Sequence, residues 1–349
     1  MSKKKYRSLK IALFFFIFIF AAGLVLSAYA YFLNRPSTYI SEESNVFKVT
    51  QGESLAAIAD RLERGKLIRS ALLIKLLSKV SRTDGSIKSG YFRILPGDST
   101  IDIHNVLVAG YQEQVKVTLP EGWTSNKVAG HLESKEIIGI EELMNPSVTA
   151  SLLQSYGIPA ESLEGYLFPD TYFFPKGYPA YGILERMVDN FFQHLETIVP
   201  DYRDWDKQLL HERIVLASIV EREYRRSEEA PLIASVFYNR LKNNVGLESC
   251  ATLVYIITEV QGRPQPEFLT SEDIKIDSAY NTYLWAGLPP GPISNPGTVA
   301  LKAAFYPAET DYWYFLLKNP ATGEHYFSTD LEEHNWAKYY YLKSVGTGG

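Results

Sequence analysis

The feature that most constrains this chain is a long apolar run near its N-terminus. Residues 11–33, IALFFFIFIFAAGLVLSAYAYFL, contain no charged side chain. A helix of this length extends roughly 34 Å at about 1.5 Å per residue, which is enough to cross a bilayer. We therefore expect a single transmembrane helix at 11–33. The alternative is a cleaved signal peptide, since Ala28-Tyr29-Ala30 resembles a cleavage site, although the run exceeds the roughly 7 to 15 apolar residues usual there.

Basic residues before the run predict its orientation. Five of the first ten residues are basic: Lys3, Lys4, Lys5, Arg7 and Lys10. Because basic flanks stay on the cytoplasmic side, residues 1–10 are expected to be a cytoplasmic tail. The chain would then be a single-pass protein of the cytoplasmic (inner) membrane. Residues 34–44, NRPSTYISEES, are expected to be a short linker to a periplasmic or extracytoplasmic region.

Composition excludes several classes of function. The formal net charge is −5, so without the five basic residues of the tail the remainder carries −10. No basic stripe is left to bind phosphates, and nucleic acid is therefore not an expected partner. Cys250 is the single cysteine, which rules out an intrachain disulfide, and we expect it to be a small buried apolar residue. The six histidines show no HExxH pattern, so we expect no metal site and no cofactor.

Residues 45–113 are expected to form a small module. FKVTQGESLAAIADRLERGKLIRSALLIKLLSKV predicts a strand, a turn and two helices, the first capped by Ser54 and the second at about 70–80. A second strand in IKSGYFRILPGDS and a helix near 100–109 follow. This order resembles a LysM-like module, a type that lies along glycan chains. The alternative is a spacer that only positions the next domain.

Residues 114–349 are expected to be a larger α+β domain with functional loops. VKVTLPEGWTSNKVAGHLE predicts a strand, a turn and a helix capped by Thr124. Helices are predicted at about 181–198 and 230–243, and DYWYFLLK with HYFSTD predicts a terminal hairpin.

Two glutamates end the apolar stretch LASIVEREY at 216–224, and a helical wheel separates them. Glu223 falls in the middle of the apolar stripe, whereas Glu221 lies on the other side, one turn before Arg225 and spaced to pair with it. An ionised carboxylate facing a core costs several kcal/mol unless it is paired or protonated. Burial raises the pKa of a carboxyl group, which a glycosidase-type general acid requires. The alternative is that Glu223 only caps or frays the end of a shorter helix.

Several stretches in this order resemble one family over most of residues 45–340. They are ASIVERE (217–223), EGYLFPDTY (164–172), ASVFYNRL (234–241), GLPPGPISNPG (287–297) and HYFSTDLEEHN (325–335). The chain resembles the YceG-like family of endolytic murein transglycosylases. The chain departs from the family pattern at two sites: Tyr224 stands where threonine is usual, and Cys250-Ala251 where Asp-Pro is usual.

The resemblance implies an activity and a set of site residues. It implies a lytic transglycosylase that cleaves bonds between N-acetylmuramic acid and N-acetylglucosamine in peptidoglycan, leaves 1,6-anhydro ends, and uses Glu223 as general acid and base. It also implies peptidoglycan strands as substrate and peptidoglycan synthases (penicillin-binding proteins) as partners. The expected substrate-binding residues are Glu164, Asp170, Asn239, Tyr255, Asn281, Thr282 and Tyr283.

Two other functions remain open from the sequence. One is a hydrolytic muramidase, in which Glu223 is the acid and Glu164 or Asp170 activates water. The other is a non-catalytic glycan-binding scaffold for cell-wall synthesis.

Overall fold

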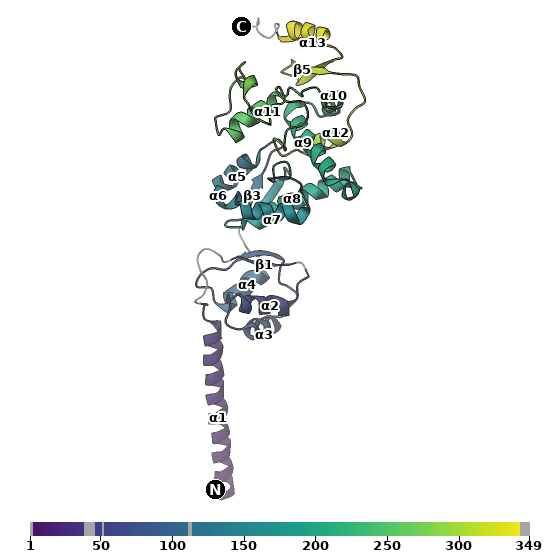
Figure 1. The fold of residues 1–349 in the computed structure, drawn as a ribbon. Helices are drawn as coiled ribbons and strands as arrows, with labels where there is room; N and C mark the ends of the chain where they lie inside the picture. Colours follow the sequence, from purple (N-terminus) through teal and green to yellow (C-terminus); the bar gives the residue numbers. More distant parts are fainter. Residues whose placement is uncertain (1–2, 38–45, 51, 111–113, 343–349) are drawn as a thin grey trace. The chain divides into compact units, whose positions relative to one another are not determined.

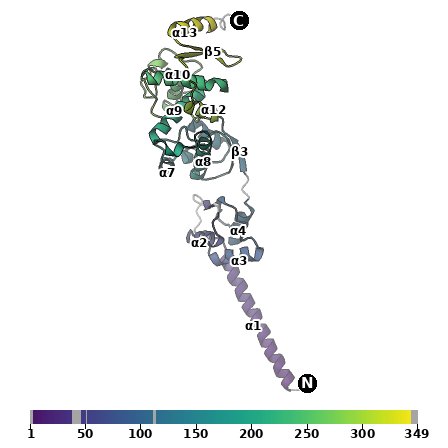
Figure 2. The same ribbon diagram turned by 90° about the vertical axis from the view of Figure 1, so that its right-hand side faces the viewer.

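The chain combines helices with small sheets and divides into two compact units. The computed structural model describes residues 3–37, 46–50, 52–110 and 114–342, and within them the strands form three two-stranded sheets (Figures 1 and 2). The first unit is Met1–Gln114 with Pro175–Tyr178, and the second is Val115–Phe174 with Pro179–Gly349. The division at 114/115 lies next to the predicted boundary at 113/114, and the mixture of helix and sheet agrees with the predicted α+β class.

Helix α1 (Lys3–Asn34) contains the apolar run. Its part Leu13–Asn34 is long and apolar enough to cross a membrane, and its most apolar window is not buried within the protein. A signal sequence near the N-terminus can meet the same criteria of length and composition, so α1 is a candidate membrane span or signal sequence. Much of the predicted linker, residues 38–44, lies outside the described residues.

The rest of the first unit has the predicted order of elements. Strands β1 (Val46–Val49) and β2 (Gly90–Arg93) pair antiparallel and are accompanied by helices α2 (Leu55–Arg64), α3 (Ala71–Ser81) and α4 (Thr100–Ala109). The predicted cap is confirmed, because the Ser54 hydroxyl accepts a hydrogen bond from the Ala57 N–H. Residues from all five elements share one apolar core. The likeness to a LysM module stays a prediction.

The second unit is mainly helical. Its helices are α5 (Ser125–Ser134), α6 (Ile140–Leu143), α7 (Pro146–Tyr156), α8 (Ala180–Ile198), α9 (Lys207–Glu223), α10 (Ala230–Lys242), α11 (Cys250–Tyr255), α12 (Thr298–Phe305) and α13 (Leu331–Ala337). Its strands are β3 (Gln114–Thr118), β4 (Thr171–Pro175), β5 (Tyr314–Asn319) and β6 (Glu324–Ser328). The terminal hairpin is confirmed as the antiparallel pair β5–β6, and α13 lies beside it in both views (Figures 1 and 2). The Thr124 cap of α5 is also confirmed.

Helix α9 lies at the centre of this unit, packed against α10, α11 and α12. All residues from Ile214 to Val220 are buried, so this half of the helix is enclosed on every side. The helical wheel assumed that the helix has a single apolar face. It therefore does not decide which of Glu221 and Glu223 points toward the core. Buried Ser218 ties a distant loop to the helix: its Oγ accepts from the Ile293 N–H at 2.9 Å, and its carbonyl accepts from Ser294 Oγ at 3.0 Å.

Asn295, at the end of the same loop, connects three segments. Its Oδ1 accepts from the backbone N–H groups of Gly165 and Leu167, both at 2.9 Å. Its Nδ2 donates to the Trp123 carbonyl at 3.0 Å and to a Glu164 oxygen at 3.1 Å. The side chain is 1% exposed, so water does not replace these bonds if they are lost.

We predict that Asn295→Ala destabilises the second unit by about 2–4 kcal/mol, since it leaves several buried donors and acceptors without partners. Chemical denaturation of the full chain in detergent, followed by near-UV circular dichroism, measures the change. Asn335→Ala, at an exposed position of α13, is the matched control and should unfold as the wild type does. Equal stability of the two variants would contradict a structural role for Asn295.

Candidate active site

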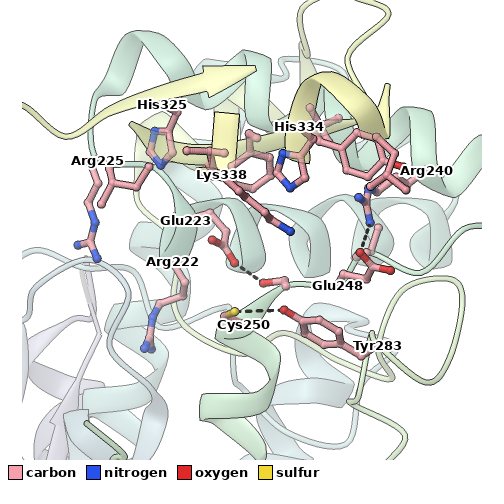
Figure 3. A pocket seen from close by; sticks show the side chains of 18 residues that line it. Arg222, Glu223, Arg225, Arg240, Glu248, Cys250, Tyr283, His325, His334 and Lys338 are labelled. Atoms are coloured by element: carbon pink, nitrogen blue, oxygen red, sulfur yellow. Dashed lines mark hydrogen bonds and ion pairs between the residues drawn. The ribbon is translucent and has the colours of Figure 1, made fainter. Parts of the chain in front are cut away.

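A cavity of about 480 Å³ opens in the second unit around the end of α9. Its walls include residues of α9, α10, the segment before α11, the β5–β6 hairpin and α13. His325, Lys338 and His334 lie along one side, Cys250 and Tyr283 along the facing side, and Glu223 lies between them (Figure 3). The cavity thus joins segments that are distant in the sequence around one carboxylate.

Glu223 is the last residue of α9, and the chain turns to an extended conformation at Tyr224. Its carboxylate accepts a hydrogen bond from Ser249 Oγ. Burial raises the pKa of Glu223 above its ordinary value, while the Ser249 hydroxyl, the Ala251 N–H and the positive charge of Arg222 are among the groups that oppose the rise. The helix does end at Glu223, as one alternative held, yet the side chain lines the cavity. A carboxyl group in this setting can hold a proton and transfer it to a ligand.

Ser249 is a site residue that the sequence analysis missed. Thr282 Oγ1 accepts from the Ser249 N–H at 3.1 Å, and Thr252 Oγ1 donates to the Ser249 carbonyl at 2.8 Å. The two threonine hydroxyls are themselves 3.0 Å apart. Thr282 therefore lies one layer behind Glu223 and positions the hydroxyl that binds it. Little in the sequence indicated Ser249 as a site residue. It is only the residue before Cys250-Ala251, where the chain differs from the family pattern.

Glu221 does not form the predicted pair with Arg225. Because α9 ends at Glu223, Arg225 lies beyond the last turn, and among the described residues no ion pair joins it to Glu221. The Glu221 carboxylate instead accepts from the Gly297 N–H at 2.9 Å, and burial raises its pKa to about 7. The Tyr224 hydroxyl donates to it at 3.4 Å. The tyrosine at position 224, where the family usually has threonine, therefore contacts Glu221 through its hydroxyl rather than Glu223.

Glu164 lies in a second buried polar centre and does not line the cavity. Its carboxylate accepts from the Ser125 N–H at 3.1 Å, at the first turn of α5, and from Asn295. Burial raises its pKa to about 8 despite these bonds. Tyr255 does not line the cavity either: burial raises the pKa of its hydroxyl, and its ring centroid is 5.1 Å from that of Tyr280.

Three more of the predicted substrate-binding residues hold loops in place. Exposed Asp170 accepts from Asn190 Nδ2 at 2.9 Å. Asn239 donates to the carbonyls of Thr310 and Tyr312 at 2.8 and 2.9 Å, and Asn281 donates to those of Ile274 and Ile276 at 2.9 and 2.8 Å. None of the three lines the cavity around Glu223.

Tyr283 does line the cavity, opposite the histidines (Figure 3). Its hydroxyl lies 3.1 Å from the sulfur of Cys250. The prediction that Cys250 is buried is wrong, because the residue is exposed at the cavity wall. Its position at the start of α11 explains this, since the helix buries Ala251, Thr252 and Leu253 on its other side.

The sequence analysis also missed the basic side chains of this cavity, which include Arg222, Arg225 and Lys338. A search of the described part of the chain finds no cluster of three His, Cys, Asp or Glu residues that could hold a metal ion. The groups in the cavity wall that could act on a ligand include two carboxyl groups, a thiol, hydroxyls, two imidazoles and the basic side chains.

Comparisons with known proteins identify the family of this chain. The sequence profile of the YceG-like family matches residues 47–339. The endolytic murein transglycosylase of Bacillus subtilis (strain 168) is 31% identical over 315 residues, covering 85% of this chain and 84% of the relative. That of Streptococcus pneumoniae serotype 2 (strain D39 / NCTC 7466) is 27% identical over 321 residues, covering 82% of this chain and 56% of the relative.

A crystal structure of a YceG-like protein from Listeria monocytogenes has the same fold. It superposes with a TM-score of 0.56 at 31% identity and covers 85% of this chain and 99% of its own. The family profile extends from β1 through α13, and thus across the Glu223 cavity. From this extended match, the chain belongs to the YceG-like family of endolytic murein transglycosylases, which are lytic transglycosylase enzymes.

Proposed function

We propose that this protein cleaves peptidoglycan strands internally, between N-acetylmuramic acid and N-acetylglucosamine, and leaves 1,6-anhydro ends. The observation that supports the proposal best is Glu223, a carboxyl group with a raised pKa that receives a hydrogen bond from Ser249 in the wall of a cavity. The names of the relatives support the same reaction class.

In the proposed reaction Glu223 acts twice. Protonated Glu223 gives its proton to the glycosidic oxygen as the bond from that oxygen to C1 of the muramic acid breaks. The 6-hydroxyl of the same sugar then bonds to C1 and returns its proton to the Glu223 carboxylate. No water is consumed, so the products together have the composition of the substrate. The Ser249 hydroxyl stabilises Glu223 while it is ionised, between the two proton transfers.

The surroundings of Glu223 favour this reaction over hydrolysis. Most glycoside hydrolases place a second carboxyl group within about 10 Å to act as nucleophile or to activate water. Glu164 and Asp170, which could have served, are absent from the cavity wall. Glu248 does line the cavity, but it forms an ion pair with Arg240 at 3.1 Å. A scaffold would have no use for a desolvated carboxyl group, which lowers stability when it ionises.

We also propose that α1 anchors the protein in the cytoplasmic membrane as a single span. The basic residues at its start support a cytoplasmic N-terminus, which leaves the catalytic domain outside, where peptidoglycan lies. The LysM-like order of residues 45–113 supports a contact of the first unit with glycan.

We predict that Glu223→Gln lowers kcat by about 10²–10⁴-fold, because the amide transfers no proton, while the fold is retained. The assay is digestion of purified peptidoglycan by the full chain in detergent, with mass spectrometry of the products. Asp170→Asn, a matched change at an exposed carboxylate outside the cavity, should leave the rate close to that of the wild type. Products of the wild type that carry hydrated reducing ends would indicate a muramidase, and an equal rate for Glu223→Gln would contradict catalysis by this residue.

We predict that Ser249→Ala moves the alkaline limb of the pH profile of kcat/KM to higher pH. The Ser249 hydroxyl stabilises ionised Glu223 and so lowers its pKa, and its removal lets burial raise that pKa further. The acid must be protonated to act, so activity persists to higher pH. Ser227→Ala, at an exposed position, is the control. An unshifted limb would show that Ser249 does not tune Glu223.

A further inference from the structure

The cavity around Glu223 is positively charged, although the chain as a whole carries a net charge of −5. The acidic side chains in its wall are Glu223 and Glu248, and the basic ones are Arg222, Arg225, Arg240 and Lys338. Arg240 is neutralised by Glu248. Since burial favours the neutral form of Glu223, the charges of Arg222, Arg225 and Lys338 are not balanced within the cavity.

These three cations have few partners of their own. Among the described residues, neither Lys338 nor Arg225 forms an ion pair, and Arg222 makes a long hydrogen bond of 3.3 Å to the Gly122 carbonyl. The side chains of Arg225 and Lys338 are exposed. They are therefore available to a ligand that enters the cavity.

Lys338 is the cation placed most directly for this purpose. It follows α13 and lies one helical turn after His334, so both side chains come from one face of the C-terminal segment. Both line the cavity on the side facing Tyr283 (Figure 3). His334 is 6% exposed, and burial together with the charges of Lys338 and Arg240 lowers its pKa to about 4. It is thus neutral near pH 7, and Lys338 carries the positive charge of this face.

The sugar rings of a peptidoglycan strand carry no negative charge with which these cations could pair. N-acetylglucosamine and peptide-substituted N-acetylmuramic acid are neutral, and cleavage builds positive charge at C1, which nearby cations would oppose. An anionic group on the substrate removes this conflict. Peptidoglycan has two kinds: the carboxylates of stem peptides, which are attached at the muramic acids along the strand, and the diphosphate of a lipid-linked strand end.

We infer that Lys338, with Arg222 and Arg225, forms a subsite beside Glu223 for an anionic group of the peptidoglycan strand. The inference rests on the proposed function and extends it to a preference among substrates. Stem-peptide carboxylates are the favoured source, because an internal cut always has a muramic acid at the reacting bond, whereas the diphosphate occurs at one end of the strand.

Binding in an inactive background tests the subsite apart from catalysis. The protein is the full chain in detergent with Glu223→Gln, alone or combined with Lys338→Ala, Lys338→Arg or Lys242→Ala. Lys242 is an exposed lysine of α10 that does not line the cavity, so its variant is the matched control. The probes are fluorescently labelled strands of equal length, with the stem-peptide carboxylates free or converted to neutral amides, each with or without the lipid diphosphate.

We expect the strand with free stem-peptide carboxylates to bind more tightly than the amidated strand, and Lys338→Ala to reduce that difference by about fivefold, as for a partly exposed charge pair. Lys338→Arg should restore it, Lys242→Ala should leave it unchanged, and added salt should weaken it. If Lys338→Ala reduces instead the difference due to the lipid diphosphate, the anion subsite stands and its ligand is the diphosphate.

Equal effects of Lys338→Ala and Lys242→Ala on all four strands would overturn the inference. The proposed function is judged separately, by whether the wild type makes 1,6-anhydro ends from the same strands. Failure of one measurement therefore does not decide the other.

Discussion

The site depends on the contact between the end of α9 and the start of α11, where Ser249 binds the Glu223 carboxylate. Ionisation of a buried carboxyl group is energetically unfavourable. A hydroxyl that donates a hydrogen bond to it stabilises the ionised form, yet the group can still bind a proton. Thr282 and Thr252 hold Ser249 in place from behind. The proposed acid is thus supported by a layer of hydroxyls rather than by a salt bridge, which would keep it ionised.

Enclosure of α9 makes this contact possible. Ser218 binds the loop before α12 through two hydrogen bonds, and Asn295 at the end of that loop binds the segments containing Trp123 and Glu164. Glu221 binds the same loop through Gly297. Three polar groups on or beside α9 thereby fix the helix, so that its last residue projects into the cavity. Glu221 and Glu223 both have raised pKa values, but one serves the packing of a loop and the other faces a cavity.

Local features were predictable to within about three residues. The caps at Ser54 and Thr124, the helices near 181–198 and 230–243, and the terminal hairpin follow from contacts between residues close in sequence. Predictions that needed distant neighbours were less successful. The pairing of Glu221 with Arg225 assumed a longer helix, and the burial of Cys250 assumed that a small apolar side chain faces inward. Asn239 and Asn281, chosen as polar residues that could bind sugar, satisfy backbone carbonyls of neighbouring loops.

The sequence by itself determined the apolar N-terminal helix, the order of elements in the first unit and the family, and the family motif indicated Glu223 as the candidate acid. These depend on runs, periodicities and motifs that are local in the chain. Only the tertiary structure decided which groups surround Glu223. Ser249, His325, His334 and Lys338 reach the cavity from elements 26 or more residues along the chain, and the pKa of a carboxyl group depends on such neighbours. Charge and burial at a site are sums over atoms near in space, and no local pattern in the sequence records them.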